Sequence, residues 1–300
     1  MAVVRSSLRV PLAALILTLG CGVSGRSTLD EDADLLGASA APSLMRRCVA
    51  EALGTAIIVH MGCGVVCVDR FANAQVGTFG ICSVWVACVL IAIYATRDIS
   101  GAHLNPAVSL SFVIYKDFPL SELVPFVASQ VFGAFVGAAA NYGCTAHGII
   151  QYEAVHRRAR GTTPSTFVGA FACGVTPEIL SPISGFLVEV WATAWFVFLI
   201  FALGDPNCSV PPAASPVVTG IVVGGLVSVF GPLTCCCINP ARDLGPRLVV
   251  FAAGFGRVAW TQWWIYAFGP PLGAVLGGAL CTYCYEFPVP TTGVLLSRVV

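Results

Sequence analysis

Long apolar runs recur along the chain from Cys48 onward, and each is bounded by charged residues, proline or glycine. Six of them approach the length of about 20 residues that a helix needs to cross a bilayer. They cover approximately residues 48–68, 77–96, 123–142, 183–203, 217–232 and 260–283. Two further apolar pieces, 105–115 and 239–252, are too short to span. The pattern predicts an all-α membrane protein with six transmembrane helices and two re-entrant half helices.

One tripeptide, Asn-Pro-Ala, occurs twice, and each copy follows two of the predicted spans. The copies are Asn105, Pro106 and Ala107, and Asn239, Pro240 and Ala241. Each half of the chain also carries a glutamate early in its first span, Glu51 in one half and Glu189 in the other. Because each half holds three spans, the second half must enter the membrane from the opposite side. We therefore expect an inverted repeat, with both tripeptides near the midplane and a transport path between the halves.

The residue types of the tripeptide favour the start of a half helix. Asparagine can cap a helix N-terminus, and proline at the first helical position gives up no hydrogen bond. Two helix N-termini that meet at the membrane centre each carry about half a positive charge, which disfavours cations, hydrated protons included. The amide NH2 groups of Asn105 and Asn239 would donate to a passing oxygen atom. These features predict a path for neutral solutes that excludes protons and ions.

The composition agrees with lipid as the outer solvent and removes several classes of function. Of 300 residues, 57% are hydrophobic and 10% are charged, whereas soluble domains carry about 25% charged residues. The 15 Lys and Arg residues balance the 15 Asp and Glu residues, so net charge gives no reason to expect a nucleic-acid partner. Most of the 14 cysteines lie in apolar runs, where they act as small apolar residues rather than as metal ligands. No motif indicates an enzyme, a cofactor or a metal site.

Several stretches resemble the major intrinsic protein (aquaporin) family, and within it the aquaglyceroporin branch. They are SGAHLNPAVS at 100–109, VPFVASQVFGAF at 124–135, GPLT at 231–234, INPARDLGPR at 238–247 and FGPPLG at 268–273. The resemblance covers about residues 47–285 and is looser across 143–181. It implies an aquaporin-like fold with one pore per protomer, assembled as a homotetramer in the lipid bilayer.

The resemblance also implies four residues at the constriction of the pore: Trp85, Val227, Cys236 and Arg242. Arginine at membrane depth costs at least about 2.5 kcal/mol, so Arg242 is expected to face a wet cavity; the alternative is an arginine that extends to the membrane interface. Trp85 would offer an apolar face to solutes that contain carbon, and its alternative is an interfacial aromatic residue. Glycerol facilitators typically carry a glycine at the position of Val227 and a second aromatic residue at the position of Cys236, and this chain departs from them at both. We therefore expect water and small uncharged solutes rather than glycerol alone.

Five further residues are expected to support the pore. Glu51 and Glu189 resemble buried glutamates that accept hydrogen bonds from the re-entrant loops, and ion pairing between helices is the alternative. His103 is expected to supply a backbone carbonyl to the pore rather than a titrating side chain. Asp243 and Arg247 match the glycerol-type pattern, and we expect Asp243 to orient arginines or backbone.

The channel domain is predicted at residues 47–285, with repeat halves at about 47–142 and 182–285. Residues 1–25 have the layout of a secretory signal or targeting segment, because arginines precede an apolar stretch that is too short to span comfortably. Residues 26–46 are predicted to form an acidic linker and 286–300 a C-terminal tail. The protein is expected to be a multi-pass membrane protein, in either the plasma membrane or an endomembrane or organelle membrane.

The function predicted from the sequence is a passive channel for water and small uncharged solutes such as glycerol or urea. Two alternatives keep the membrane fold. A secondary transporter also uses inverted repeats and broken helices, but the predicted spans carry no acid beyond Glu51 and Glu189 to bind a coupling ion. A non-conducting scaffold would keep the same helices and pack the pore shut.

Overall fold

The structure is a computed structural model that describes residues 41–206 and 208–286. The predicted signal or targeting segment, most of the predicted acidic linker, and residues 287–300 of the predicted tail lie outside the described residues. The compact unit described below begins at Pro42.

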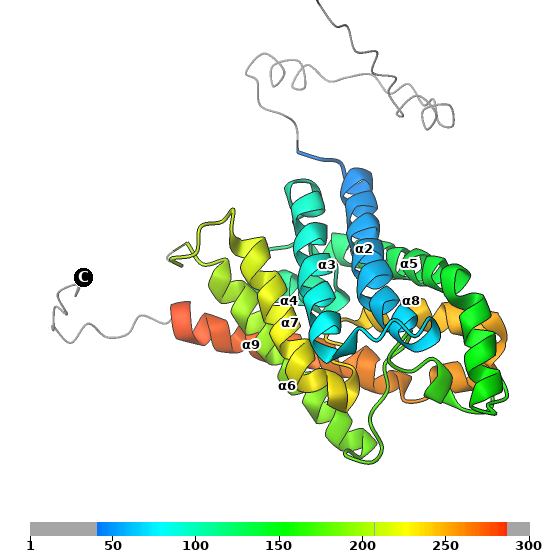
Figure 1. The fold of residues 1–300 in the computed structure, drawn as a ribbon. Helices are drawn as coiled ribbons and strands as arrows, with labels where there is room; N and C mark the ends of the chain where they lie inside the picture. Colours follow the sequence, from blue (N-terminus) through cyan, green and yellow to red (C-terminus); the bar gives the residue numbers. More distant parts are fainter. Residues whose placement is uncertain (1–40, 207, 287–300) are drawn as a thin grey trace, which may run out of the picture. The chain divides into compact units, whose positions relative to one another are not determined.

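Within the described residues the chain forms eight α-helices joined by loops and short helical turns (Figure 1). The α-helices are α2 (Leu44–Phe71), α3 (Gly77–Ser100), α4 (Pro106–Tyr115), α5 (Leu120–Val155), α6 (Pro182–Leu203), α7 (Ser215–Thr234), α8 (Pro240–Val250) and α9 (Trp263–Glu286). The turns are η2 (Pro164–Thr166), η3 (Phe251–Phe255) and η4 (Gly256–Trp260). In the described part of the chain, six helices are long and apolar enough to cross a membrane, namely α2, α3, α5, α6, α7 and α9, which confirms the predicted fold class.

The ends of two spans differ from the sequence prediction. Helix α5 continues to Val155, although its apolar run ends at Tyr142. An apolar run indicates only the part of a helix that contacts lipid. The helix itself can continue beyond that part as long as its residues tolerate the helical conformation. Helix α7 ends at Thr234, where Cys235 adopts a left-handed conformation, so the three cysteines that follow belong to a loop.

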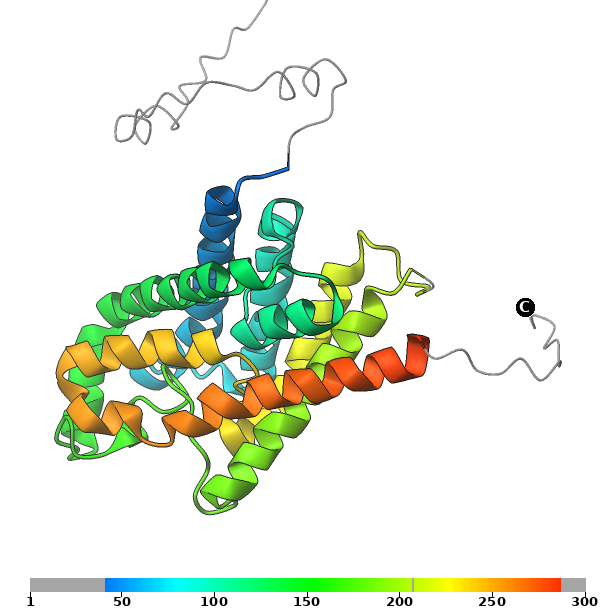
Figure 2. The ribbon, with the colours of Figure 1, turned by 180° about the vertical axis from the view of Figure 1, so that it is seen from behind.

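The inverted repeat is visible in the way the long helices pair. Helix α2 packs against α5, and the equivalent helix α6 packs against α9 (Figure 2). Glycines make both close approaches possible, because an added Cβ at each would collide with a backbone carbonyl of the facing helix. The contacts are Gly133 with Ala52 and Gly137 with Ala56 in the first half, and Gly273 with Val190 and Gly277 with Ala194 in the second.

The half helices α4 and α8 begin at the repeated tripeptides, as expected from their sequence. The Oδ1 atom of Asn105 accepts a hydrogen bond from the Ala107 N–H at 2.9 Å. Asn239 caps α8 in the same way, accepting from the Ala241 N–H at 3.0 Å. Each half helix packs against the last long helix of the other half, α4 against α9 and α8 against α5, and the two half helices contact each other. The two helix N-termini therefore meet inside the bundle.

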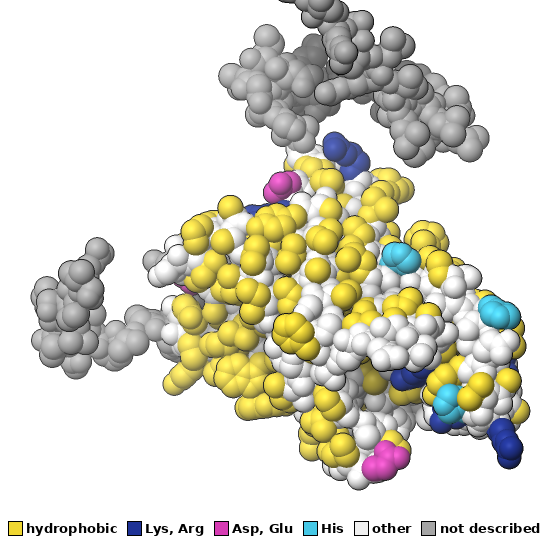
Figure 3. All heavy atoms as spheres, viewed as in Figure 1, with side chains coloured by type: hydrophobic (Ala, Val, Ile, Leu, Met, Phe, Trp, Pro, Cys, Tyr) yellow, Lys and Arg dark blue, Asp and Glu magenta, His cyan; other side chains and the backbone are white. Residues whose placement is uncertain are grey.

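The outer surface of the bundle is apolar. On the face shown in Figure 3, hydrophobic side chains are spread over the described surface and charged side chains are few. Large residues such as Phe79, Phe132 and Phe268 are 88%, 61% and 59% exposed. A continuous exposed surface of this kind indicates lipid or another apolar partner as its natural neighbour.

Candidate conduction pathway

Glu51 on α2 holds the loop that precedes α4. Its Oε1 atom accepts hydrogen bonds from the Ser100 hydroxyl at 2.6 Å and from the His103 N–H at 3.0 Å. Its Oε2 atom accepts from the Leu104 N–H at 2.6 Å and from the Gln130 amide at 2.8 Å. The side chain is fully buried, and these donors offset the cost of placing a carboxyl group away from water.

Glu189 on α6 holds the second loop with the same pattern. Its Oε1 atom accepts from the Thr234 hydroxyl at 2.6 Å and from the Cys237 N–H at 2.9 Å. Its Oε2 atom accepts from the Ile238 N–H at 2.9 Å. Counted back from the asparagine, these donors stand at the positions that Ser100, His103 and Leu104 hold in the first half. The inverted repeat thus extends to individual hydrogen bonds.

Both loops pass through left-handed backbone conformations at matching positions. The residues with positive φ are Gly101, Ala102 and Leu104 in the first loop, and Cys235, Cys236 and Ile238 in the second. The φ angles of Ala102 and Cys236 are 54° and 46°. Such conformations cost non-glycine residues about 1–3 kcal/mol each and persist only where their surroundings hold them. The glutamate hydrogen bonds supply this support on the two loops.

The two asparagines link the loops to each other. The Nδ2 atom of Asn105 donates to the Ile238 carbonyl at 2.8 Å, and the Nδ2 atom of Asn239 donates to the Leu104 carbonyl at 2.8 Å. Each amide therefore caps its own half helix with its oxygen and uses one of its two N–H bonds across the repeat. The second N–H of each amide is the one available to a solute.

A cavity of about 200 Å³ contains both asparagines in its wall. It is lined by α2, α3, α4, α6, α7, the start of α8 and the two loops, and it reaches Trp85, Cys236 and Arg242. Much of the remaining wall is apolar, with Val89 and Phe196 among its residues. Among the described residues that line the cavity, Arg242 is the only one with a permanent charge. The cavity thus offers polar donors along the loops and hydrocarbon on the surrounding helices.

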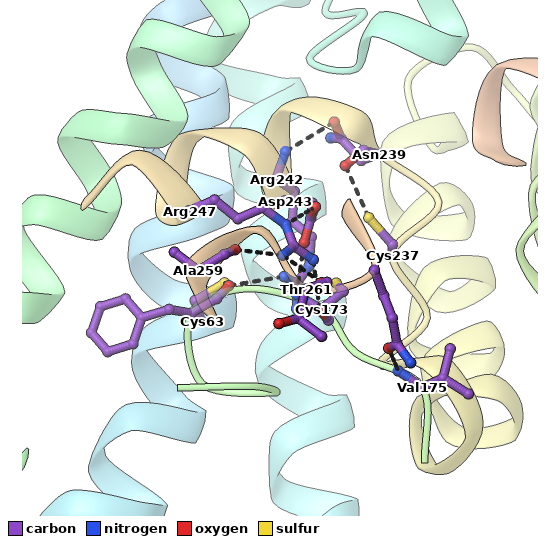
Figure 4. A network of polar contacts seen from close by, with 12 residues as sticks. Cys63, Cys173, Val175, Cys237, Asn239, Arg242, Asp243, Arg247, Ala259 and Thr261 are labelled. Atoms are coloured by element: carbon purple, nitrogen blue, oxygen red, sulfur yellow. Dashed lines mark hydrogen bonds and ion pairs between the residues drawn. The ribbon is translucent and has the colours of Figure 1, made fainter. Parts of the chain in front are cut away.

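Arg242 lies in the first turn of α8 and is 2% exposed. Its Nη1 atom donates to the Phe171 carbonyl at 3.1 Å, and its Cζ atom lies 5.4 Å from the ring centroid of Trp85, a cation–π distance. Its Nε atom is buried and has no hydrogen-bond partner in the part of the chain that the structure describes. Figure 4 shows Arg242 within the polar network around α8. Arg242 also lines the cavity, so its positive charge lies in the cavity wall.

The loop segment 166–176 forms part of this site, which was not predicted from its sequence. Besides the Phe171 carbonyl, it presents the Cys173 backbone, whose N–H donates to Asp243 Oδ1 at 2.7 Å. The Cys173 carbonyl accepts from Arg247 Nη2 at 2.8 Å (Figure 4). Asp243 also pairs with Arg247 at 2.5 Å, so its arginine partner is Arg247 rather than its neighbour Arg242. The nine-residue apolar run at 167–175 was the available signal for a buried loop.

Two other predicted site residues differ in their position relative to the cavity. Val227 is buried on α7 but is not among the residues that line the cavity, whereas Val223, one turn earlier, is. His103 lines the cavity, and its ring centroid lies 4.4 Å from that of Phe112. Its Nδ1 atom lies 3.1 Å from the Ser109 hydroxyl. Within the described ranges, no group of three or more His, Cys, Asp or Glu side chains is arranged to hold a metal ion.

Comparisons with known proteins agree with this architecture. A family model described as Major intrinsic protein matches residues 38–281. The glycerol uptake facilitator protein of Escherichia coli (strain K12) is 36% identical over 243 residues, which cover 78% of this chain and 86% of that protein. The propanediol uptake facilitator of Citrobacter freundii is 35% identical over 248 residues, covering 80% and 92%. The X-ray structure of the aquaglyceroporin from Plasmodium falciparum is similar, with a TM-score of 0.69 and 26% identity, covering 79% of this chain and 95% of that one.

Proposed function

The chain belongs to the major intrinsic protein family, and from that premise we propose that its cavity conducts glycerol and other small uncharged solutes passively across the membrane. It is a multi-pass membrane channel whose relatives are named glycerol and propanediol uptake facilitators. Water is expected to share the path, since every polar group that binds a solute hydroxyl also binds water.

The position of Arg242 and Trp85 together in the cavity wall, with the Arg242 guanidinium 5.4 Å from the centre of the indole ring, is the observation that carries the proposal. A polyol presents hydroxyl oxygens on one side and C–H groups on the other. At this point the protein offers a charged donor on one wall and an aromatic ring on another, so it matches both sides of such a solute. Cys236, also in the wall, leaves more room than a second aromatic ring would.

Exclusion of protons and ions follows from the charges around the path. The N-termini of α4 and α8 meet beside the cavity, and each contributes about half a positive charge. Arg242 adds a full positive charge in the cavity wall. A cation in the cavity would face these charges without a described acid in the wall to offset them. The asparagine amides, which can only donate through their nitrogens, also interrupt a proton relay through water.

Stopped-flow light scattering of proteoliposomes tests the proposal. Vesicles that contain the protein should re-swell in a glycerol gradient faster than empty vesicles, and a pH-sensitive dye trapped inside should show no added proton leak. Glycerol permeability equal to that of empty vesicles would refute conduction. A proton leak that accompanies glycerol flux would refute only the claim that protons are excluded.

Assembly and location complete the proposal. We expect a homotetramer, as the membership in the major intrinsic protein family implies. The mass of the detergent-solubilised particle would test this, and a monomeric mass would contradict it. The plasma membrane and internal membranes remain equal alternatives for the location, which imaging of the tagged full-length chain would decide.

A further inference from the structure

The indole ring of Trp85 lies against a glycine of the neighbouring helix. A Cβ atom built on Gly62 of α2 would lie 2.8, 2.8 and 2.9 Å from the Cη2, Cζ3 and Cζ2 atoms of the ring. Carbon atoms in contact are normally about 3.5–4.0 Å apart. No side chain therefore fits at position 62 while the ring keeps its place.

The geometry of this contact shows which way the ring would have to move. The three ring carbons are consecutive and nearly equidistant from the added atom, which places that atom over the face of the six-membered ring rather than beyond its edge. Trp85 lines the cavity, whereas Gly62 is not among the lining residues, so the ring separates Gly62 from the cavity. A ring pushed away from α2 would therefore move into the solute path, beside the Arg242 guanidinium.

We propose that Gly62 is a specificity-determining position of the channel. Because it carries no side chain, it lets Trp85 lie against α2 and so sets how much of the constriction is open to solutes larger than water. A methyl group at Gly62 would require the ring to shift by about 0.7 Å, the difference between a normal contact and the distance found here. The inference rests on the proposed function, because it requires that solutes pass Trp85. Gly62 is a positioning residue, since it acts through Trp85.

The test compares glycerol and water permeability of Gly62→Ala and wild-type protein in proteoliposomes. Glycerol permeability should fall by about tenfold, which corresponds to about 1.4 kcal/mol added to the barrier for passing the displaced ring, while water permeability falls much less. Gly143→Ala on α5 is the matched control, because an added Cβ there meets nothing within 4 Å. The control should leave both permeabilities unchanged.

Combining the change with Trp85→Phe separates a steric effect on the ring from a general effect on α2. Phenylalanine lacks the outer ring carbons that collide, so Gly62→Ala should leave the glycerol-to-water ratio unchanged in the Trp85→Phe background. An unchanged ratio in the single variant, or a changed ratio that persists in the double variant, overturns the inference. If Gly62→Ala alone fails to fold, recovery of folded protein in the double variant supports the clash, and failure of both overturns it. Wild-type protein without glycerol flux would instead refute the proposed function.

Discussion

Replacing Glu189 with glutamine tests whether its carboxylate holds the second re-entrant loop in place. The carboxylate offers two acceptor oxygens to three donors, the Thr234 hydroxyl and the N–H groups of Cys237 and Ile238. Glutamine has nearly the same shape but exchanges one acceptor for an NH2 donor. The substitution therefore changes hydrogen bonding at the loop while it leaves packing almost intact.

The size of the effect follows from the best arrangement that glutamine can adopt. With its oxygen at the Oε1 site, it keeps Thr234 and Cys237 as donors, and its NH2 group faces the Ile238 N–H. That N–H would be buried without an acceptor, which costs about 1–3 kcal/mol, and the two retained bonds would lose their charge-assisted strength. We expect a total loss of about 3 kcal/mol in the free energy of unfolding.

Thermal unfolding of the purified protein in detergent, followed by circular dichroism, measures this loss. Glu178→Gln is the matched control, because Glu178 is exposed and surface substitutions usually stay within about 0.5 kcal/mol. The Glu189→Gln variant should unfold several degrees below both the control and the wild type. The explanation would be wrong if Glu189→Gln and Glu178→Gln unfolded at the same temperature.

Two further predictions concern the cavity and the helix contacts. A mercurial that binds the Cys236 thiol in the cavity wall should block solute flux; Cys236→Ser should then conduct in its presence, whereas Cys144→Ser, changed at an exposed position, should stay sensitive. Block that persists in Cys236→Ser would contradict the assignment of the block to Cys236 and would leave Cys237, which also lines the cavity, as its site. Gly137→Ala should destabilise the protein by about 1–3 kcal/mol, because its Cβ would lie 2.6 Å from the Ala56 carbonyl oxygen. Gly143→Ala, with open space around its added Cβ, should stabilise the protein by up to about 1 kcal/mol through helix propensity, and equal unfolding temperatures of the two variants would contradict this account.

The fold was predictable because its signals are local or repeated. Apolar runs of spanning length identify membrane helices wherever they occur, since a helix that crosses the bilayer needs about 20 predominantly apolar residues. The Asn-Pro pairs at 105–106 and 239–240 predicted helix starts through capping and proline geometry, and both half helices begin there. The glutamates at 51 and 189 stood out because an acid in a span needs partners.

The rest of the site depends on contacts between distant residues, which no local pattern reports. The hydrogen bond from Asn105 to Ile238 joins positions far apart in the sequence. The loop segment 166–176 reaches Arg242 only through a backbone carbonyl, and any residue type can supply that group. The position of the Trp85 ring depends on the absence of a side chain at Gly62. The sequence shows the glycine but does not show that the ring lies against it. The role of Val227 at the constriction remains a prediction.

Glycerol entry into proteoliposomes, measured with and without imposed proton and sodium gradients, tests the central claim most directly. The account predicts entry that exceeds that of protein-free vesicles, rises in proportion to the glycerol gradient and does not change when either ion gradient is imposed or reversed. Entry no faster than in protein-free vesicles would contradict the claim of conduction. Entry whose rate follows an ion gradient would contradict the claim that the protein is a passive channel and would favour a secondary transporter.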